Sequence, residues 1–68
     1  MAKYEIRSID KNINGSYVIN YCASENGHTW LGHNQYYGYS KREALRQARE
    51  DLNIKRNPCA IYDYTKRS

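Results

Sequence analysis

The sequence contains no phenylalanine, a single proline and only two cysteines. Two cysteines are too few for a disulfide-stapled scaffold, so we expect Cys22 and Cys59 to be small buried thiols in a reducing compartment. One bridge between them is the alternative. Without phenylalanine, the aromatic part of a core must come from Trp30 and the eight tyrosines. Each buried tyrosine brings a hydroxyl that needs a hydrogen-bond partner.

Long apolar runs are also missing from the chain. None approaches the roughly 18 residues of a membrane span, and the first residues lead directly into an alternating pattern without a signal-peptide core. We therefore expect a cytoplasmic protein with no membrane partner.

A length of 68 residues predicts one domain, residues 1–68. Domains this small bury only about 60% of the surface that the unfolded chain exposes, so core energy is scarce. The aliphatic candidates for the core are Ile6, Val18, Ile19, Leu31, Leu45, Leu52, Ile54 and Ile61. So thin a core suits a marginal monomer and equally a homodimer that buries one more face, and both states stay open.

The first half of the chain predicts a three-stranded meander. Strands are expected at Tyr4–Ser8, at Ser16–Ala23 and at His28–His33, where β-branched and aromatic residues are frequent. The dipeptides Asn14-Gly15 and Asn26-Gly27 separate them and tolerate the positive φ of tight hairpin turns.

The second half predicts one helix and one further strand. Ser40 and Glu43 have the spacing of a capping box, so a helix begins there. An apolar stripe that includes Ala44 and Ala48 follows, and the stretch before Pro58 ends the helix. Residues 59–64 alternate as a fourth strand. The expected fold is α+β, a small antiparallel sheet in the order β-β-β-α-β with one helix packed on one face, and the sequence does not fix which face.

Positive charge is distributed unevenly along the chain. Residues 12–40 contain no lysine or arginine, whereas the rest of the chain carries all eleven basic side chains. Three arginines with helical spacing line one helix face, which suits phosphate neutralisation, and a solvated helix face is the alternative. The predicted nucleic-acid contacts are Lys41, Arg42, Arg46, Arg49, Lys55 and Arg56.

Tyrosines gather on one face of the predicted strands. Tyr17 and Tyr21 share a face with Ile19, and if that face is open its rings offer stacking platforms for unpaired bases. The alternative is that these tyrosines form the core in place of phenylalanine. The residues predicted for an aromatic interface are Trp30, Tyr36, Tyr37, Tyr62 and Tyr64.

Catalytic and metal-binding patterns do not stand out. The two histidines and two cysteines lack the close pairing of structural zinc sites. No nucleophile and base order, paired-carboxylate site or glycine-rich phosphate loop is evident. We expect a binding protein that is not an enzyme and has no cofactor and no metal.

The segment from Gly38 to Ala48 resembles the start of the last helix of double-stranded-RNA-binding domains, where a Ser-Lys-Lys-x-Ala-Lys pattern follows a three-stranded sheet. The resemblance implies that Lys41 and Arg42 contact phosphates. Trp30-Leu31-Gly32 together with Glu43-Ala44 is similar to the signature of the β-β-β-α DNA-binding domains of plant ethylene-response regulators and of some phage-type integrase N-termini. That similarity implies the same sheet-plus-helix order.

Two functions follow as hypotheses. The first is a small basic nucleic-acid-binding module that binds RNA or DNA, single- or double-stranded, with phosphates on the helix and bases or sugars on sheet tyrosines. The second is a protein-interaction module that binds through exposed aromatic residues, which supply many interface hot spots. The asparagine- and tyrosine-rich composition looks like that of phage accessory proteins, which implies an inhibitor of a host restriction or CRISPR complex.

Overall fold

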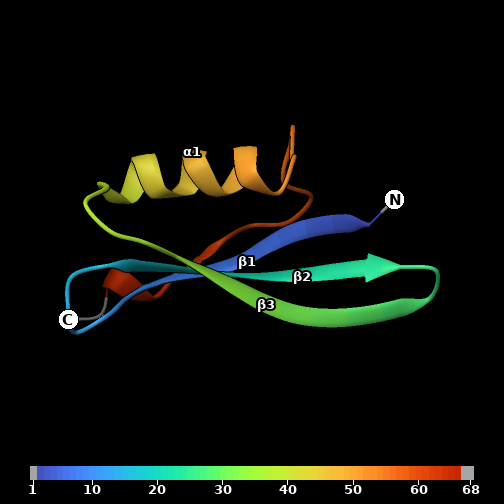
Figure 1. Cartoon of the computed structure of the whole chain (residues 1–68), viewed down its shortest axis with the longest axis horizontal. Coiled ribbons are helices and arrows are strands. Elements are labelled where there is room, and N and C mark those ends of the chain that lie inside the picture. The colour runs from blue at the N-terminus through green and yellow to red at the C-terminus, as the bar shows by residue number, and fades with distance from the viewer. Residues whose placement is uncertain (1, 67–68) are drawn as a thin grey trace.

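The computed structural model describes residues 2–66 as a four-stranded sheet with a helix across one face (Figure 1). The strand order in the sheet is β3-β2-β1-β4. The α+β class and the β-β-β-α-β order are confirmed. Within these residues no helix is long and apolar enough to cross a bilayer. The elements are β1 (Lys3–Lys11), β2 (Tyr17–Glu25), β3 (His28–Tyr36), α1 (Lys41–Asp51), β4 (Tyr62–Asp63) and the 3-10 turn η1 (Tyr64–Lys66).

Both predicted hairpin turns form. Asn26 and Gly27 have φ values of 50° and 81°, which makes a tight two-residue loop between β2 and β3. In the first turn only Gly15 has positive φ, at 90°. That loop is closed by the Asn12 N–H, which donates to the Ser16 carbonyl at 2.8 Å. All three strands are longer than their patterns predicted.

A β-bulge in β1 changes which residues face the helix after the correctly predicted Ile6. Ile6 pairs with Tyr21 and Ser8 with Asn20, so Arg7 is an extra residue. The bulge interrupts the two-residue period, and Ile6 and Ile9 both reach the buried side of the sheet although they are three residues apart. Ile9 was therefore absent from the predicted core.

The helix packs on the sheet face that carries the tyrosines of β2. Ile19 is fully buried against Ala44 and Ala48, whose small side chains let helix and sheet approach closely. Tyr17 packs against this core, so the interpretation of the tyrosine face as a helix-covered face holds. Leu31 was wrongly placed in the core, because it points to the opposite face and is 79% exposed. Partly buried residues that pack against the core are Leu45, Leu52, Ile54 and Ile61.

The last strand differs from the prediction in length and direction. Only Tyr62 and Asp63 pair, and they pair in parallel with Ser8 and Ile9 of β1, so the sheet is mixed. The direction follows from the chain path, because β3 runs parallel to β1 and α1 carries the chain back across the sheet before β4 begins. The preceding residues 52–61 form an irregular segment beside β1 (Figure 1).

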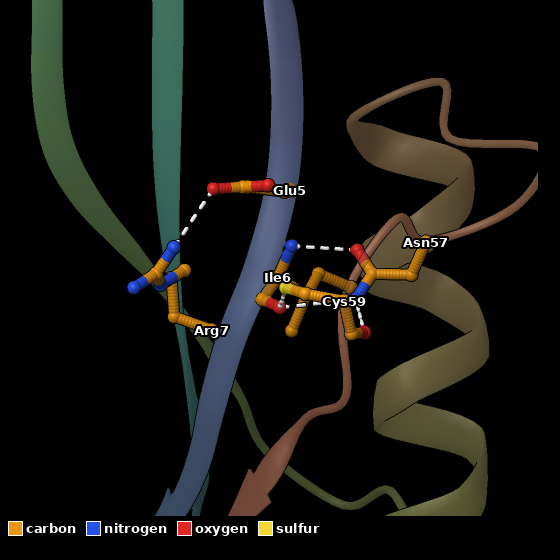
Figure 2. Close-up of polar contacts among 5 residues, drawn as sticks. All are labelled: Glu5, Ile6, Arg7, Asn57 and Cys59. Atoms are coloured by element: carbon orange, nitrogen blue, oxygen red, sulfur yellow. Dashed lines mark hydrogen bonds and ion pairs between the residues drawn. The ribbon is translucent and has the colours of Figure 1, made fainter.

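Asn57 fastens this irregular segment to the edge of β1 (Figure 2). Its Oδ1 accepts the Ile6 N–H at 2.8 Å, and its Nδ2 donates to the Ile6 carbonyl at 3.1 Å. The same Nδ2 donates to the Cys59 carbonyl at 2.6 Å. One amide side chain thus replaces the backbone pairing of a neighbouring strand. It leaves the polar groups of Ile6 satisfied and holds the segment in place.

The helix is too short to cover the sheet. Eleven residues of α1 span about 16 Å, whereas nine residues of β2 or β3 span about 30 Å. The predicted capping box fixes where α1 begins: the Ser40 Oγ accepts the Glu43 N–H at 3.2 Å, and Glu43 accepts the Ser40 N–H at 3.0 Å. These bonds lower the pKa of Glu43. The β2–β3 hairpin consequently projects beyond the end of α1 (Figure 1).

Tyr36 ties the end of β3 to α1. Its side chain is 7% exposed, and its hydroxyl donates to Asp51 at 2.8 Å. Burial raises the pKa of Tyr36 to about 12, and the neighbouring Asp51 carboxylate adds to the shift. The prediction that placed Tyr36 on a surface interface is corrected, because its ring belongs to the core.

We predict that Tyr36→Phe lowers the free energy of unfolding by about 1 kcal/mol, since it removes the bond to Asp51 and keeps the ring. Urea unfolding followed by circular dichroism measures the change. Tyr37→Phe is the matched control, because the hydroxyl of this exposed tyrosine bonds only at the surface, to Gln35 and Asn14. Equal losses in the two variants would contradict the structural role of Tyr36.

An ion pair between Lys41 and Asp63 predicts acid sensitivity. The Lys41 ammonium donates to Asp63 at 2.7 Å, and with Thr65 it lowers the pKa of Asp63 from 3.8 to about 2. A depressed carboxyl pKa stabilises the fold above pH 3.8, and this contribution is lost as the pH falls toward about 2. Lys41→Met should therefore flatten the decline of unfolding free energy across this range in urea titrations. Arg42→Met, on the same helix turn, should leave the decline unchanged.

Candidate nucleic-acid interface

A groove of about 880 Å³ opens where the sheet extends past the end of α1. One wall comes from the start of β1 and of β3, and the other comes from the irregular segment that follows α1. Because Asn57 holds that segment against β1, the two walls are fixed relative to each other. The lining residues used below are Lys3, Tyr4, Trp30, Ile54, Lys55 and Arg56.

Aromatic rings line the sheet side of the groove. Trp30 is 42% exposed, so one part of its indole contacts protein and another part is open to a ligand. Tyr4 packs edge-to-face on Tyr21, with ring centroids 5.8 Å apart. Tyr21 in turn lies over Gly32, where an added Cβ would come within 2.5 Å of its hydroxyl oxygen. Gly32 thus gives Tyr21 the room to support Tyr4.

Basic side chains form the rim. Lys3, Lys55 and Arg56 line the groove itself, and Lys55 also borders an adjacent hollow of about 430 Å³ with Arg46 and Arg49. The two hollows therefore share Lys55, and we call Arg46, Arg49, Lys55 and Arg56 the basic margin; the acidic residues Glu25 and Glu50 also line the groove and the smaller hollow, respectively.

The cations of this margin are available to a ligand. Among residues 2–66, the side chains of Arg46, Arg49, Lys55 and Arg56 form no hydrogen bond and no ion pair within 4 Å. Two carboxylates of α1 have hydrogen-bond partners of their own: Glu43 caps the helix, and Asp51 accepts from Tyr36 and from Gln47 at 3.0 Å. The bonds to Ser40 lower the pKa of Glu43, and the charge of Arg46 also lowers it. Glu50 borders the smaller hollow and is the acidic residue there.

Two of the six predicted phosphate contacts lie outside this margin. Lys41 is at the first turn of α1, where it bonds to Asp63 and, at 3.4 Å, to Thr65. Arg42 is exposed one turn before Arg46 and does not line either hollow. The structure brings together only the four predicted cations that come from the end of α1 and the segment after it.

The predicted aromatic residues are dispersed. Trp30 alone lines the groove. Tyr36 is in the core, and Tyr37 is exposed with its hydroxyl donating to Gln35 at 2.9 Å. Tyr62 and Tyr64 are exposed near the opposite edge strand, with ring centroids 4.5 Å apart. These rings do not form one surface.

Lys3 and Tyr4 were missed because they belong to the site only through strand pairing. They pair with Ser24 and Ala23, and Ala23 pairs with Trp30 in β3. Their positions follow from the hairpin register and from the length of α1, which leaves this end of the sheet uncovered. Neither residue has a motif of its own in the sequence.

Both cysteines are free thiols, and Cys59 donates to the Ile6 carbonyl at 3.5 Å. In the part of the chain that the structure describes, no three His, Cys, Asp or Glu side chains cluster in a way that could hold a metal ion. Comparison of the chain with protein-family models, curated proteins and solved structures returns no match, so the assignment of this groove depends on its own geometry.

Proposed function

We propose that this protein is a nucleic-acid-binding module that holds phosphates on the basic margin and stacks a base on Trp30. The observation that carries the proposal is that four cations, which form no ion pair within residues 2–66, line a groove with a half-exposed indole and the hollow beside it. Binding, and not catalysis, is the activity that such a surface supports.

The chemistry of the groove matches the two parts of a nucleotide. Lysine and arginine side chains neutralise phosphates and release condensed counterions, which supplies most of the affinity that does not depend on sequence. Aromatic faces accept bases of any kind by stacking. Lys55 and Arg56 line the same groove as Trp30, so a phosphate and its base can be bound together.

The net positive charge of the protein favours its encounter with a nucleic acid. The chain has a formal charge of +4, and residues 12–40 contain no lysine or arginine, so the basic side chains lie in β1, in α1 and in the residues after α1. An excess of positive charge attracts a polyanion before contact and raises the association rate at low salt. Apolar lining from Leu52, Ile54 and Pro58 excludes water once a base is seated.

We predict salt-sensitive binding of at least one class of single- or double-stranded RNA or DNA in fluorescence anisotropy. With about four phosphate contacts, affinity should fall about 50- to 150-fold between about 50 and about 200 mM salt. Replacing Arg46, Arg49, Lys55 and Arg56 by glutamine should abolish most of this salt dependence together with the affinity. Binding that is indifferent to salt would contradict the proposal.

The matched control replaces basic residues outside the groove. Arg7 pairs with Glu5 at 2.9 Å, and Lys11 lies over the Tyr17 ring at 5.5 Å. Changing Arg7 and Lys11 to glutamine lowers the net charge without touching the margin. The control should therefore keep most of the affinity, and a loss equal to that of the margin variant would show that only overall charge matters.

We predict that Trp30→Ala weakens binding about 5- to 150-fold, the equivalent of one stacked base. The salt dependence should not change, because no charge is removed. Trp30 is the single tryptophan of the chain, so quenching of intrinsic fluorescence on binding reports the stacking directly. Tyr62→Ala, at an exposed ring outside the groove, is the control and should bind as the unmodified protein does.

The protein-interaction hypothesis retains one supporting observation. Tyr62 and Tyr64 form an exposed aromatic pair that does not line the groove. Flat anisotropy traces for all four nucleic acids would favour this second function. Capture of a host complex that is lost in Tyr62→Ala with Tyr64→Ala, without unfolding, would then identify the surface.

A further inference from the structure

The two edges of the sheet differ in how their backbone groups are paired. At the β1 edge, β4 pairs with Ser8 and Ile9, and Asn57 occupies the backbone groups of Ile6 (Figure 2). At the other edge, β3 pairs along its nine residues with β2 and with no other part of residues 2–66. The β1 edge is therefore closed by specific contacts, whereas the outer backbone groups of β3 have no strand beside them in the described residues.

The open edge lacks the features that keep edge strands from pairing. Strand β3 contains no lysine, arginine, aspartate, glutamate or proline. Its pairing with β2 is regular from Tyr17 to Glu25, so no bulge twists the edge away. Natural proteins blunt exposed edges with such charges, prolines or bulges, because bare backbone groups pair with another strand.

We propose that β3 pairs in antiparallel fashion with β3 of a second copy of this chain, so that one sheet continues across a two-fold dimer. A second copy fits this edge because an uncharged strand meets itself without placing like charges opposite each other. This proposal is independent of nucleic-acid binding.

Hairpin geometry fixes which residues face the free edge. In a two-residue hairpin the flanking pair, here Glu25 and His28, exchanges both backbone bonds, and every second pair after it does the same. The outward N–H and C=O groups then belong to the intervening residues of β3. These residues are Thr29, Leu31, His33 and Gln35.

The register of the β3–β3 pairing follows from the length over which the two strands overlap. Residues whose backbone groups point to the free edge must pair with each other, and the register that pairs every residue of His28–Tyr36 is centred on Gly32. Leu31 then lies opposite the second copy's His33, and the two Leu31 side chains are diagonal neighbours at the axis. In the dimer, Leu31, which is 79% exposed in the single chain, gains these neighbours.

The dimer arrangement has a consequence for the groove. A two-fold axis perpendicular to the continued sheet places both helices on one face. Both Trp30 side chains lie on that same face, since Trp30 pairs with Ala23 on the helix-covered side. Two grooves would then be presented side by side to one ligand.

Sedimentation velocity over a wide concentration range tests the proposal with a charge-pair design. The unmodified protein should dimerise. Leu31→Lys with His33→Lys places two pairs of like charges across the axis and should raise the dimer Kd about tenfold or more. Leu31→Lys with His33→Glu places opposite charges there and should restore the dimer. Circular dichroism confirms that each variant is folded.

Tyr62→Lys, on the other edge, is the control and should dimerise normally. The proposal is overturned if the unmodified protein remains monomeric at every concentration. It is also overturned if the double-lysine variant dimerises as strongly as the unmodified protein. A folded but monomeric Leu31→Lys, His33→Glu variant overturns the Gly32-centred register. Anisotropy measurements on the double-lysine variant separate the two proposals, because nucleic-acid binding by a folded monomer shows that the groove acts without the dimer.

Discussion

The amide side chain of Asn57 is the contact on which the arrangement of this small domain depends. Its bonds to both backbone groups of Ile6 hold the segment after α1 against β1, 51 positions away in the chain. This contact supplements the two paired residues of β4, the packing of Ile54 and Ile61 on the core and the ion pair between Lys41 and Asp63. The groove wall and the closure of the β1 edge at Ile6 both involve this contact.

A difference in length between helix and strands produces the candidate site. The strands of the hairpin extend past α1 on one side, so aromatic residues that would be core in a fully covered sheet lie in a groove instead. The same side receives the basic residues from the end of α1 and from the segment after it. A stretch without lysine or arginine, residues 12–40, supplies most of the sheet, and the cations approach it from its margins.

The core of this domain is thin, and much of the sheet surface is not covered by it. Few residues are fully buried, and the packing relies on Ile6, Ile9 and Ile19 against two alanines of α1. Tyr36 completes this core because Asp51 and Asn34 satisfy its hydroxyl. A core of this size leaves apolar side chains such as Leu31 on the outer face of the sheet.

The sequence by itself determined the local elements. The capping box at Ser40, the Asn26-Gly27 turn and the alanine stripe act over a few residues, so their structures follow from nearby backbone and side-chain chemistry. Only the tertiary structure decided which residues share a face and a groove. The bulge at Arg7 shifts the inward face of β1. The hydroxyl of buried Tyr36 is satisfied by Asp51, fifteen residues later, and Tyr4 and Lys55 line one groove although they are far apart in the chain. Such contacts depend on register and packing between distant segments, which local patterns do not encode.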